Sequence, residues 1–217
     1  MAVGAMMKAD MKHYLDSSEY IDWNHPLVIA KATELAEDCV TDEAVAKRCF
    51  EFVRDSIKHS WDCRMNPVSC KASDVLIHGT GYCYAKSHLL AALLRANAIP
   101  AALCYQRLTV ENDGPPYCLH GLNAVYLKQH GWYRIDARGN KPNVTADFCP
   151  PIEKLAFPII NALERDFPQL LAEPLPLVVK ALTENKTVEQ VFENLPDAEV
   201  INVLPRRLRP LTIRPSH

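Results

Sequence analysis

The first third of the chain repeats apolar residues at the spacing of amphipathic helices. Pro26 suits the first turn of a helix that runs to about Cys39. Its apolar stripe consists of Val28, Ala32, Leu35, Ala36 and Cys39. Thr41, followed by two acidic residues, is typical of an N-cap, and the pattern predicts a second helix from there to about Lys58.

Helical periodicity is lost between His59 and Thr80, where residues typical of turns gather. We expect a loop there, with one short helix near Ser73. A strong helical pattern then begins after Gly81 and must stop before Pro100. Cys83 is therefore predicted to lie in the first turn of this helix.

Three short segments rich in β-branched and aromatic residues follow, at 101–110, 119–127 and 132–137. Turn residues separate them, so we expect antiparallel strands. Helices followed by strands predict an α+β fold in which the N-terminal helices pack on one face of an antiparallel sheet.

Proline punctuates the chain after residue 150, and two weaker helical patterns occur at 178–183 and 188–195. Thr187 and Gln190 have the spacing of a capping box. We predict a core over residues 1–150 and a partly helical C-terminal extension over 151–217, which packs on the core or forms an arm. The last segment, from Val203, combines arginines and prolines and is expected to be extended.

Composition narrows the class of protein. A length of 217 residues suits one compact unit, and a net charge of -2 argues against a nucleic-acid partner. The N-terminal stretch has no signal-peptide core, and no apolar run reaches the roughly 20 residues of a membrane span. We therefore expect a cytoplasmic protein whose eight cysteines are reduced thiols.

Cys83 has the sequence context of a nucleophile. The N-terminus of a helix favours a thiolate, which is the reactive form of cysteine. Gly79 and Gly81 would let a substrate carbonyl approach the amides of the first turn, as an oxyanion site requires.

A nucleophilic thiol needs a base, and the base needs an acceptor that orients it. His120 and Asp136 lie on consecutive predicted strands, and they share a face only if the hairpin loop has an odd number of residues or a bulge intervenes. Each residue also has a plain interpretation. A helical cysteine is usually a buried apolar residue, a strand histidine is usually just hydrogen-bonded, and Asp136 could simply end its strand.

All three residues together resemble the core of the transglutaminase-like superfamily. The resemblance rests on Gly81-Tyr82-Cys83 opening a helix that ends in residues 93–101, on His120 leading a strand, and on the segment from Gly131 to Asp136. It covers roughly residues 45–140 and implies a papain-like α+β fold with a Cys83-His120-Asp136 triad. Two departures stand out: Ala98 replaces a usual glycine, and Gly121-Leu122-Asn123 replaces the more common Ala-Trp segment.

The resemblance also implies an oxyanion donor upstream of the cysteine, for which Trp61 is a candidate through its indole N–H. Tyr84, Tyr105 and Arg138 are candidates for the substrate pocket. The chain has no room for the accessory β-domains of animal transglutaminases, so neither protein cross-linking nor calcium control is expected.

We therefore expect a cysteine enzyme that attacks an amide or peptide bond through a thioester, with hydrolysis favoured over transfer to an amine. Its substrate would be a peptide, a protein or a small amide, and no cofactor or metal is expected. One alternative is a non-catalytic peptide-binding module on the same fold. Another is metal binding through Cys63, Cys70, His78 and Cys118, although no zinc-finger spacing is present. The oligomeric state stays open.

Overall fold

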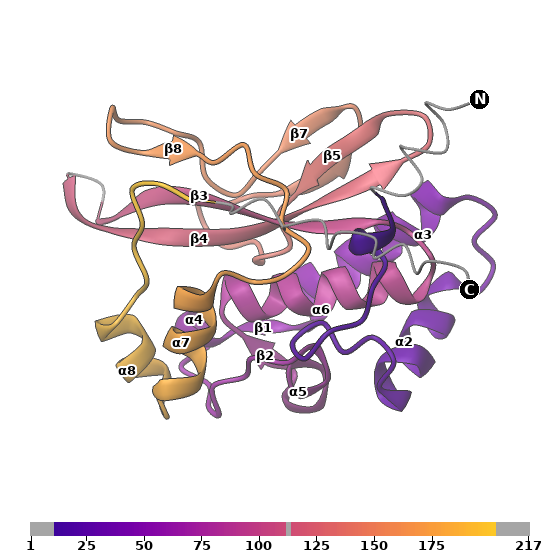
Figure 1. Ribbon diagram of the computed structural model, residues 1–217, viewed down its shortest axis with the longest axis horizontal. Helices are drawn as coiled ribbons and strands as arrows, with labels where there is room; N and C mark the ends of the chain where they lie inside the picture. The colour runs from indigo at the N-terminus through magenta and orange to yellow at the C-terminus, as the bar shows by residue number, and fades with distance from the viewer. Residues whose placement is uncertain (1–10, 112–113, 203–217) are drawn as a thin grey trace, which may run out of the picture.

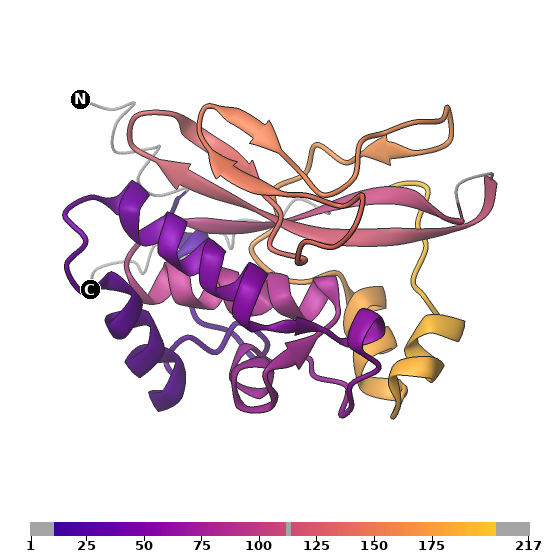
Figure 2. The ribbon, with the colours of Figure 1, turned by 180° about the vertical axis from the view of Figure 1, so that it is seen from behind.

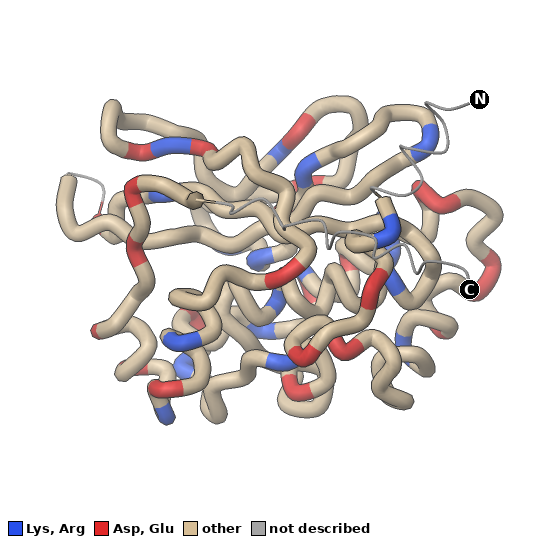
Figure 3. Tube along the Cα trace, in the orientation of Figure 1, with Lys and Arg blue, Asp and Glu red and all other residues tan. Residues whose placement is uncertain are grey.

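The computed structural model describes residues 11–111 and 114–202, which form two layers (Figure 1). One layer is a curled antiparallel sheet, and the helices lie along one side of it, as the view from behind also shows (Figure 2). This is the papain-like α+β arrangement expected from the sequence. Basic and acidic positions are interspersed over both layers (Figure 3). Within the described residues, no helix combines the length and apolar character needed to cross a membrane.

Two N-terminal helices form where the apolar stripes predict them. They are α2 (Pro26–Ala36) and α3 (Asp42–Glu51), and the π-helical turn η2 (Phe52–Ser56) continues α3. A short helix that was not predicted, η1 (Lys12–Tyr14), precedes them. Thr41 caps α3, since its hydroxyl accepts a hydrogen bond from the backbone N–H of Ala44 at 3.1 Å. The predicted end of the first helix was three residues too late, because the chain leaves α2 after Ala36.

The segment predicted as a loop contains more structure than expected. It consists of β1 (Lys58–His59), α4 (Ser60–Cys63), α5 (Ala72–His78) and β2 (Thr80–Gly81). The short helix expected near Ser73 is α5. Strands β1 and β2 form a two-residue parallel pair in which His59 lies opposite Gly81. Two residues carry no detectable period, so this pair could not be predicted from the sequence.

Helix α6 (Cys83–Ala96) is the centre of the molecule. Every residue from Cys83 to Arg95 is buried, because the sheet covers one side of the helix and α2, α3 and α5 pack around the others. The helix is therefore buried on all sides, which its helical pattern in the sequence did not reveal.

The main sheet has the strand order β5-β4-β3-β8, and all its neighbours are antiparallel. Its strands are β3 (Ala101–Glu111), β4 (Gly114–Leu127), β5 (Gly131–Ile135) and β8 (Arg165–Asp166). β4 begins earlier than predicted and includes Pro115 and Pro116. These prolines are tolerated because β5 pairs only with Asn123 to Leu127, so the early part of β4 has an open edge there.

The segment after residue 150 packs against the rest of the chain. Its remaining elements are β7 (Ile152–Lys154), α7 (Pro176–Glu184) and α8 (Val188–Glu193). β7 pairs with β6 (Asp147–Cys149), which comes just before this segment. Val178, Leu182, Val188 and Val191 belong to the same buried cluster as α6. Thr187 caps α8 by accepting from the N–H of Gln190 at 3.3 Å. The predicted extended segment from Val203 lies outside the described residues.

Candidate active site

Cys83 is the first residue of α6 and is held by the turn that precedes it. The pairing of β2 with β1 fixes Gly81, and no side chain caps the helix start at Tyr82. The first-turn amides of a helix have no partner within the helix, so they are available to a ligand. The backbone N–H of Gly121 on β4 lies 3.5 Å from the Cys83 sulfur. Cys83 is 7% exposed and lines a cavity.

His120 and Asp136 are brought together by the length of the β4–β5 hairpin. The last paired residues are Leu127 and Gly131, so three residues form the loop. An odd count places even-numbered residues of both strands on one face, which was the condition predicted from the sequence. β5 ends at Ile135, opposite Asn123, and one further step places Asp136 opposite Leu122, diagonal to His120. Nε2 of His120 and Oδ2 of Asp136 are 2.7 Å apart.

Asp136 is fully buried yet ionised. Burial alone would raise the pKa of its carboxyl, but His120 and the backbone N–H groups of Ala156 and Arg138 outweigh burial and lower it. Both N–H groups lie 3.1 Å from the carboxylate, one on each oxygen. An ionised Asp136 only accepts hydrogen bonds, so Nε2 of His120 carries the proton between them.

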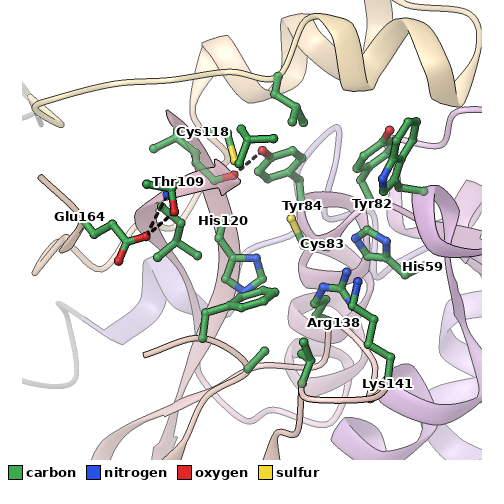
Figure 4. A pocket seen from close by; sticks show the side chains of 18 of the residues that line it. His59, Tyr82, Cys83, Tyr84, Thr109, Cys118, His120, Arg138, Lys141 and Glu164 are labelled. Atoms are coloured by element: carbon green, nitrogen blue, oxygen red, sulfur yellow. Dashed lines mark hydrogen bonds between the residues drawn. The ribbon is translucent and has the colours of Figure 1, made fainter. Parts of the chain in front are cut away.

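The imidazole of His120 and the Cys83 sulfur both project into the same cavity (Figure 4). Burial opposes a charge on His120, but Asp136 and Cys83 outweigh it and raise the pKa of the imidazole to about 10. Phe157 stands edge-on to the imidazole, with ring centroids 5.0 Å apart. His120 therefore has a fixed orientation between a sulfur and a carboxylate.

Cys83, His120 and Phe157 line a cavity of about 530 Å³. Of the pocket residues expected from the sequence, Trp61, Tyr84 and Arg138 line it. Tyr105 lies elsewhere: it is buried, and its hydroxyl accepts a hydrogen bond from the N–H of Leu175. Side chains alternate between the two faces of a sheet, and the sequence could not show on which face Tyr105 lies.

Trp61 forms a wall of the cavity. Its indole stacks on Phe192 of α8 at 3.6 Å, with the two ring planes 2° apart. The guanidinium of Arg64 lies 3.3 Å from the centre of the indole, which at these distances places it on the opposite face. Leu195 also lines the cavity, so the C-terminal extension contributes directly to the site.

His59 was not expected at this site. Its pairing with Gly81 places its ring against Tyr82, with centroids 5.6 Å apart, and it lines the cavity beside Cys83 (Figure 4). Nδ1 is buried and lies 3.5 Å from Oδ2 of Asp62, but it makes no hydrogen bond among the described residues. Burial and the nearby Arg138 hold the pKa of His59 well below its usual range, so the imidazole is neutral. Only the long-range β1–β2 pairing brings it here.

Arg138 and Lys141 meet one carboxylate, that of Asp62 on α4. Arg138 holds it in a two-pronged ion pair, at 2.7 and 3.1 Å, and Lys141 Nζ lies 2.9 Å from it. Burial would raise the pKa of Asp62, but Arg138 and Lys141 outweigh burial and lower it to about 2. Arg138 and Lys141 form a cationic side of the cavity, and both come shortly after Asp136 in the sequence.

The model of the transglutaminase-like superfamily matches residues 29–137, which is half of the chain. The chain belongs to this superfamily. Its fold is the fold of cysteine enzymes of that kind.

Several solved structures resemble the chain. A candidate cysteine protease from Cytophaga hutchinsonii is 19% identical, with a TM-score of 0.48 over 59% of this chain and 42% of that one. The periplasmic domain of TgpA from Pseudomonas aeruginosa is 20% identical, with a TM-score of 0.43 over 57% of this chain and 45% of that one. The chain thus spans less than half the length of either structure. No curated protein matches it.

The departures from the usual transglutaminase-like motif have local explanations. Gly121 contacts Tyr84: a Cβ at this position would lie 3.0 Å from the tyrosine ring and 3.1 Å from its Cα. Asn123 donates to the backbone carbonyl of Ser87 at 3.0 Å and so ties β4 to α6. Ala98 has φ of +57°, a conformation that favours glycine.

The other cysteines do not join the site as a metal set. Cys49 and Cys104 are buried, and Cys39 is half-buried. Cys118 lines the cavity, whereas Cys63 is exposed on α4. Within residues 11–111 and 114–202, no three histidine, cysteine or acidic side chains gather as metal ligands.

Proposed function

We propose that the protein is a cysteine acyl-transfer enzyme that cleaves amide bonds, with Cys83 as nucleophile, His120 as general acid and base, and Asp136 as the group that orients His120. The observation that carries the proposal is the position of His120, which lies between the Cys83 sulfur and the Asp136 carboxylate inside one cavity. That order of thiol, imidazole and carboxylate is the arrangement that activates a nucleophile.

In the proposed reaction, the Cys83 thiolate attacks the carbonyl carbon of the amide and forms a C–S bond. His120, as imidazolium, gives its proton to the amide nitrogen, the C–N bond breaks and the amine leaves. Water then attacks the thioester while His120 takes one of its protons. The C–S bond breaks, and the carboxylic acid leaves the restored thiolate and imidazolium.

The oxyanion formed in each step needs hydrogen-bond donors. The backbone N–H of Cys83 is one candidate, since it lies in the first turn of α6. For the second donor we favour His59 over Trp61. His59 is neutral and lacks a hydrogen-bond partner, whereas the indole of Trp61 is held between Arg64 and Phe192. A neutral imidazole can donate one N–H without adding charge.

Hydrolysis, as by a peptidase or amidase, is the favoured outcome. Transfer to an amine requires a site that binds the amine and excludes water. The eight unpaired cysteines suit a reducing compartment, which supports our proposal of a cytoplasmic enzyme acting on peptides, proteins or small amides.

The test is a panel of short acyl-peptide nitroanilides, with release of the chromophore and the mass of the acid-quenched protein measured together. Turnover and an acyl adduct on the peptide containing Cys83 are expected for the wild type. Cys83→Ala should lose both and keep the fold, because alanine is well accepted in helices. Cys63→Ala, which removes an exposed thiol, is the control. Binding without turnover across the panel would favour the non-catalytic module instead.

A further inference from the structure

The cationic side of the cavity, formed by Arg138 and Lys141, points to the class of substrate. We propose that Lys141, beside Arg138, binds a carboxylate of the substrate, so that the enzyme prefers amides that carry a free carboxylate near the bond to be cleaved. This inference rests on the proposed function for its catalytic consequence. The binding site itself is independent of turnover.

The charges on this side do not balance. Asp62 is the one carboxylate within ion-pair distance of Arg138 or Lys141 in the described part of the chain, and it serves both cations. The other acids near the cavity are engaged elsewhere. Asp136 holds His120, and Glu164 accepts from Thr109, Ile160 and Asn161 through both oxygens. One positive charge therefore remains for an anion.

Lys141 is the group free to bind it. Its ammonium has three N–H donors, and one of them reaches Asp62. The side chain is 41% exposed, so a bound carboxylate would displace loosely held water rather than a protein partner. Its backbone is fixed, because Lys141 and Val144 exchange hydrogen bonds of 2.9 and 3.0 Å across a tight turn.

The cationic side lies close enough to the catalytic groups for one substrate to contact both. The ring of Phe157 is 5.0 Å from that of His120 and 5.5 Å from the guanidinium carbon of Arg138. Because an extended peptide advances about 3.5 Å per residue, a carboxylate held beside Arg138 lies within about three residues of His120.

The two sides of the cavity differ in character. Figure 4 shows Arg138 and Lys141 together on one side of His120, with Thr109 and Glu164 on the other. Leu108, Val110 and Ile160 also line the cavity, and the Glu164 carboxylate is already saturated by hydrogen bonds. A substrate with one anionic and one apolar end therefore has a single preferred direction.

Two pairs of nitroanilide-type substrates test this. One pair carries a succinyl or an acetyl cap on the acyl side, and the other releases aminobenzoate or aniline. For one of the pairs, wild-type kcat/KM should be about tenfold higher for the carboxylated member, mainly through KM, which corresponds to about 1.4 kcal/mol. Lys141→Met should bring that ratio close to one, and Lys141→Arg should restore it. Lys128→Met, which alters an exposed lysine paired with Asp42, should leave it unchanged.

Calorimetric titration of Cys83→Ala with the same compounds separates the two proposals. If carboxylated compounds bind this variant about tenfold more tightly and Lys141→Met removes the difference, the anion site stands even where the wild type turns nothing over. If the wild type cleaves both members of each pair equally, or the preference survives Lys141→Met, the anion site is wrong and the proposed function is untouched.

Discussion

His120 and Asp136 are joined by a 2.7 Å hydrogen bond that depends on the length of one hairpin. The three-residue loop between Leu127 and Gly131 places both side chains on the same face, and the end of β5 at Ile135 frees Asp136 to turn toward His120. A loop one residue longer or shorter would place the two side chains on opposite faces.

The first prediction concerns Asp136→Asn. The carboxylate is the strongest influence that raises the pKa of His120 to about 10 against the effect of burial. An amide keeps the size of the side chain but can favour the wrong tautomer, so kcat should fall by about two to four orders of magnitude. Because His120 must be protonated to release the amine, the alkaline limb of the rate profile should also move to lower pH. Unchanged kinetics between pH 6 and 10 would return Asp136 to a structural role.

The second prediction is that Cys83 is the thiol alkylated fastest in the native protein at pH 6. Burial raises the pKa to about 12 for each of Cys49, Cys70, Cys104 and Cys118. Cys63 is exposed but has no imidazole within hydrogen-bond distance among the described residues. Iodoacetamide labelling followed by peptide mass spectrometry measures each site.

The same labelling separates His120 from other histidines. His120→Ala should shift the labelling of Cys83 to higher pH, because the imidazolium that favours the thiolate is removed. His130→Ala, in the hairpin loop beside Glu43, should not. Equal rates for Cys63 and Cys83 in the wild type would contradict the proposed thiolate–imidazolium pair.

The parts of the site that the sequence predicts are those fixed by local patterns. The start of α6 at Cys83 follows from the glycine-rich turn and the helical period, and the hairpin follows from two short strands. His59 and Phe192 reach the cavity through contacts that no local pattern contains. His59 depends on a two-residue parallel pair, and Phe192 belongs to a helix more than one hundred residues after Cys83. Tyr105 lies on a strand as predicted, but its side chain does not line the cavity, because the strand prediction did not show which face it occupies.

Lys86 leads to a third prediction, on stability. It is 1% exposed, and its ammonium donates to the backbone carbonyls of Ile57 and Arg54. Burial, together with nearby Arg138, lowers the pKa of Lys86 from 10.5 to about 7. Between those pH values the unfolded chain binds a proton that the folded chain does not, so this group's contribution to the free energy of unfolding should rise with pH.

Urea unfolding of the wild type and Lys86→Met at pH 7, 8, 9 and 10 measures that contribution as a difference. The wild type should gain stability relative to the variant as pH rises. Lys154→Met, at an exposed lysine, should show a constant difference from the wild type. Parallel curves for Lys86→Met would mean that Lys86 stays protonated in the folded protein throughout this range.

The fourth prediction comes from Ala98, where the chain departs from the glycine usual in its superfamily. Ala98 lies two residues after the last residue of α6 and has φ of +57°. The N–H groups of Ala98 and Ile99 bond back to Arg95 and Leu94 at 2.9 and 3.0 Å. A residue with a side chain costs about 1–2 kcal/mol in this conformation, and glycine avoids that cost. The greater backbone entropy of glycine in the unfolded chain cancels part of this gain. Ala98→Gly should therefore stabilise the protein by about 0.5–1 kcal/mol and raise Tm by about 1–4 °C.

Ala96→Gly, two residues earlier and still inside α6, provides the matched control. Here φ is helical, so glycine only adds entropy to the unfolded chain and should destabilise the protein by about 1 kcal/mol. Thermal unfolding of the two variants should thus shift Tm in opposite directions for the same chemical change. If Ala98→Gly also lowers Tm, the left-handed conformation at the end of α6 is not the one the protein adopts in solution.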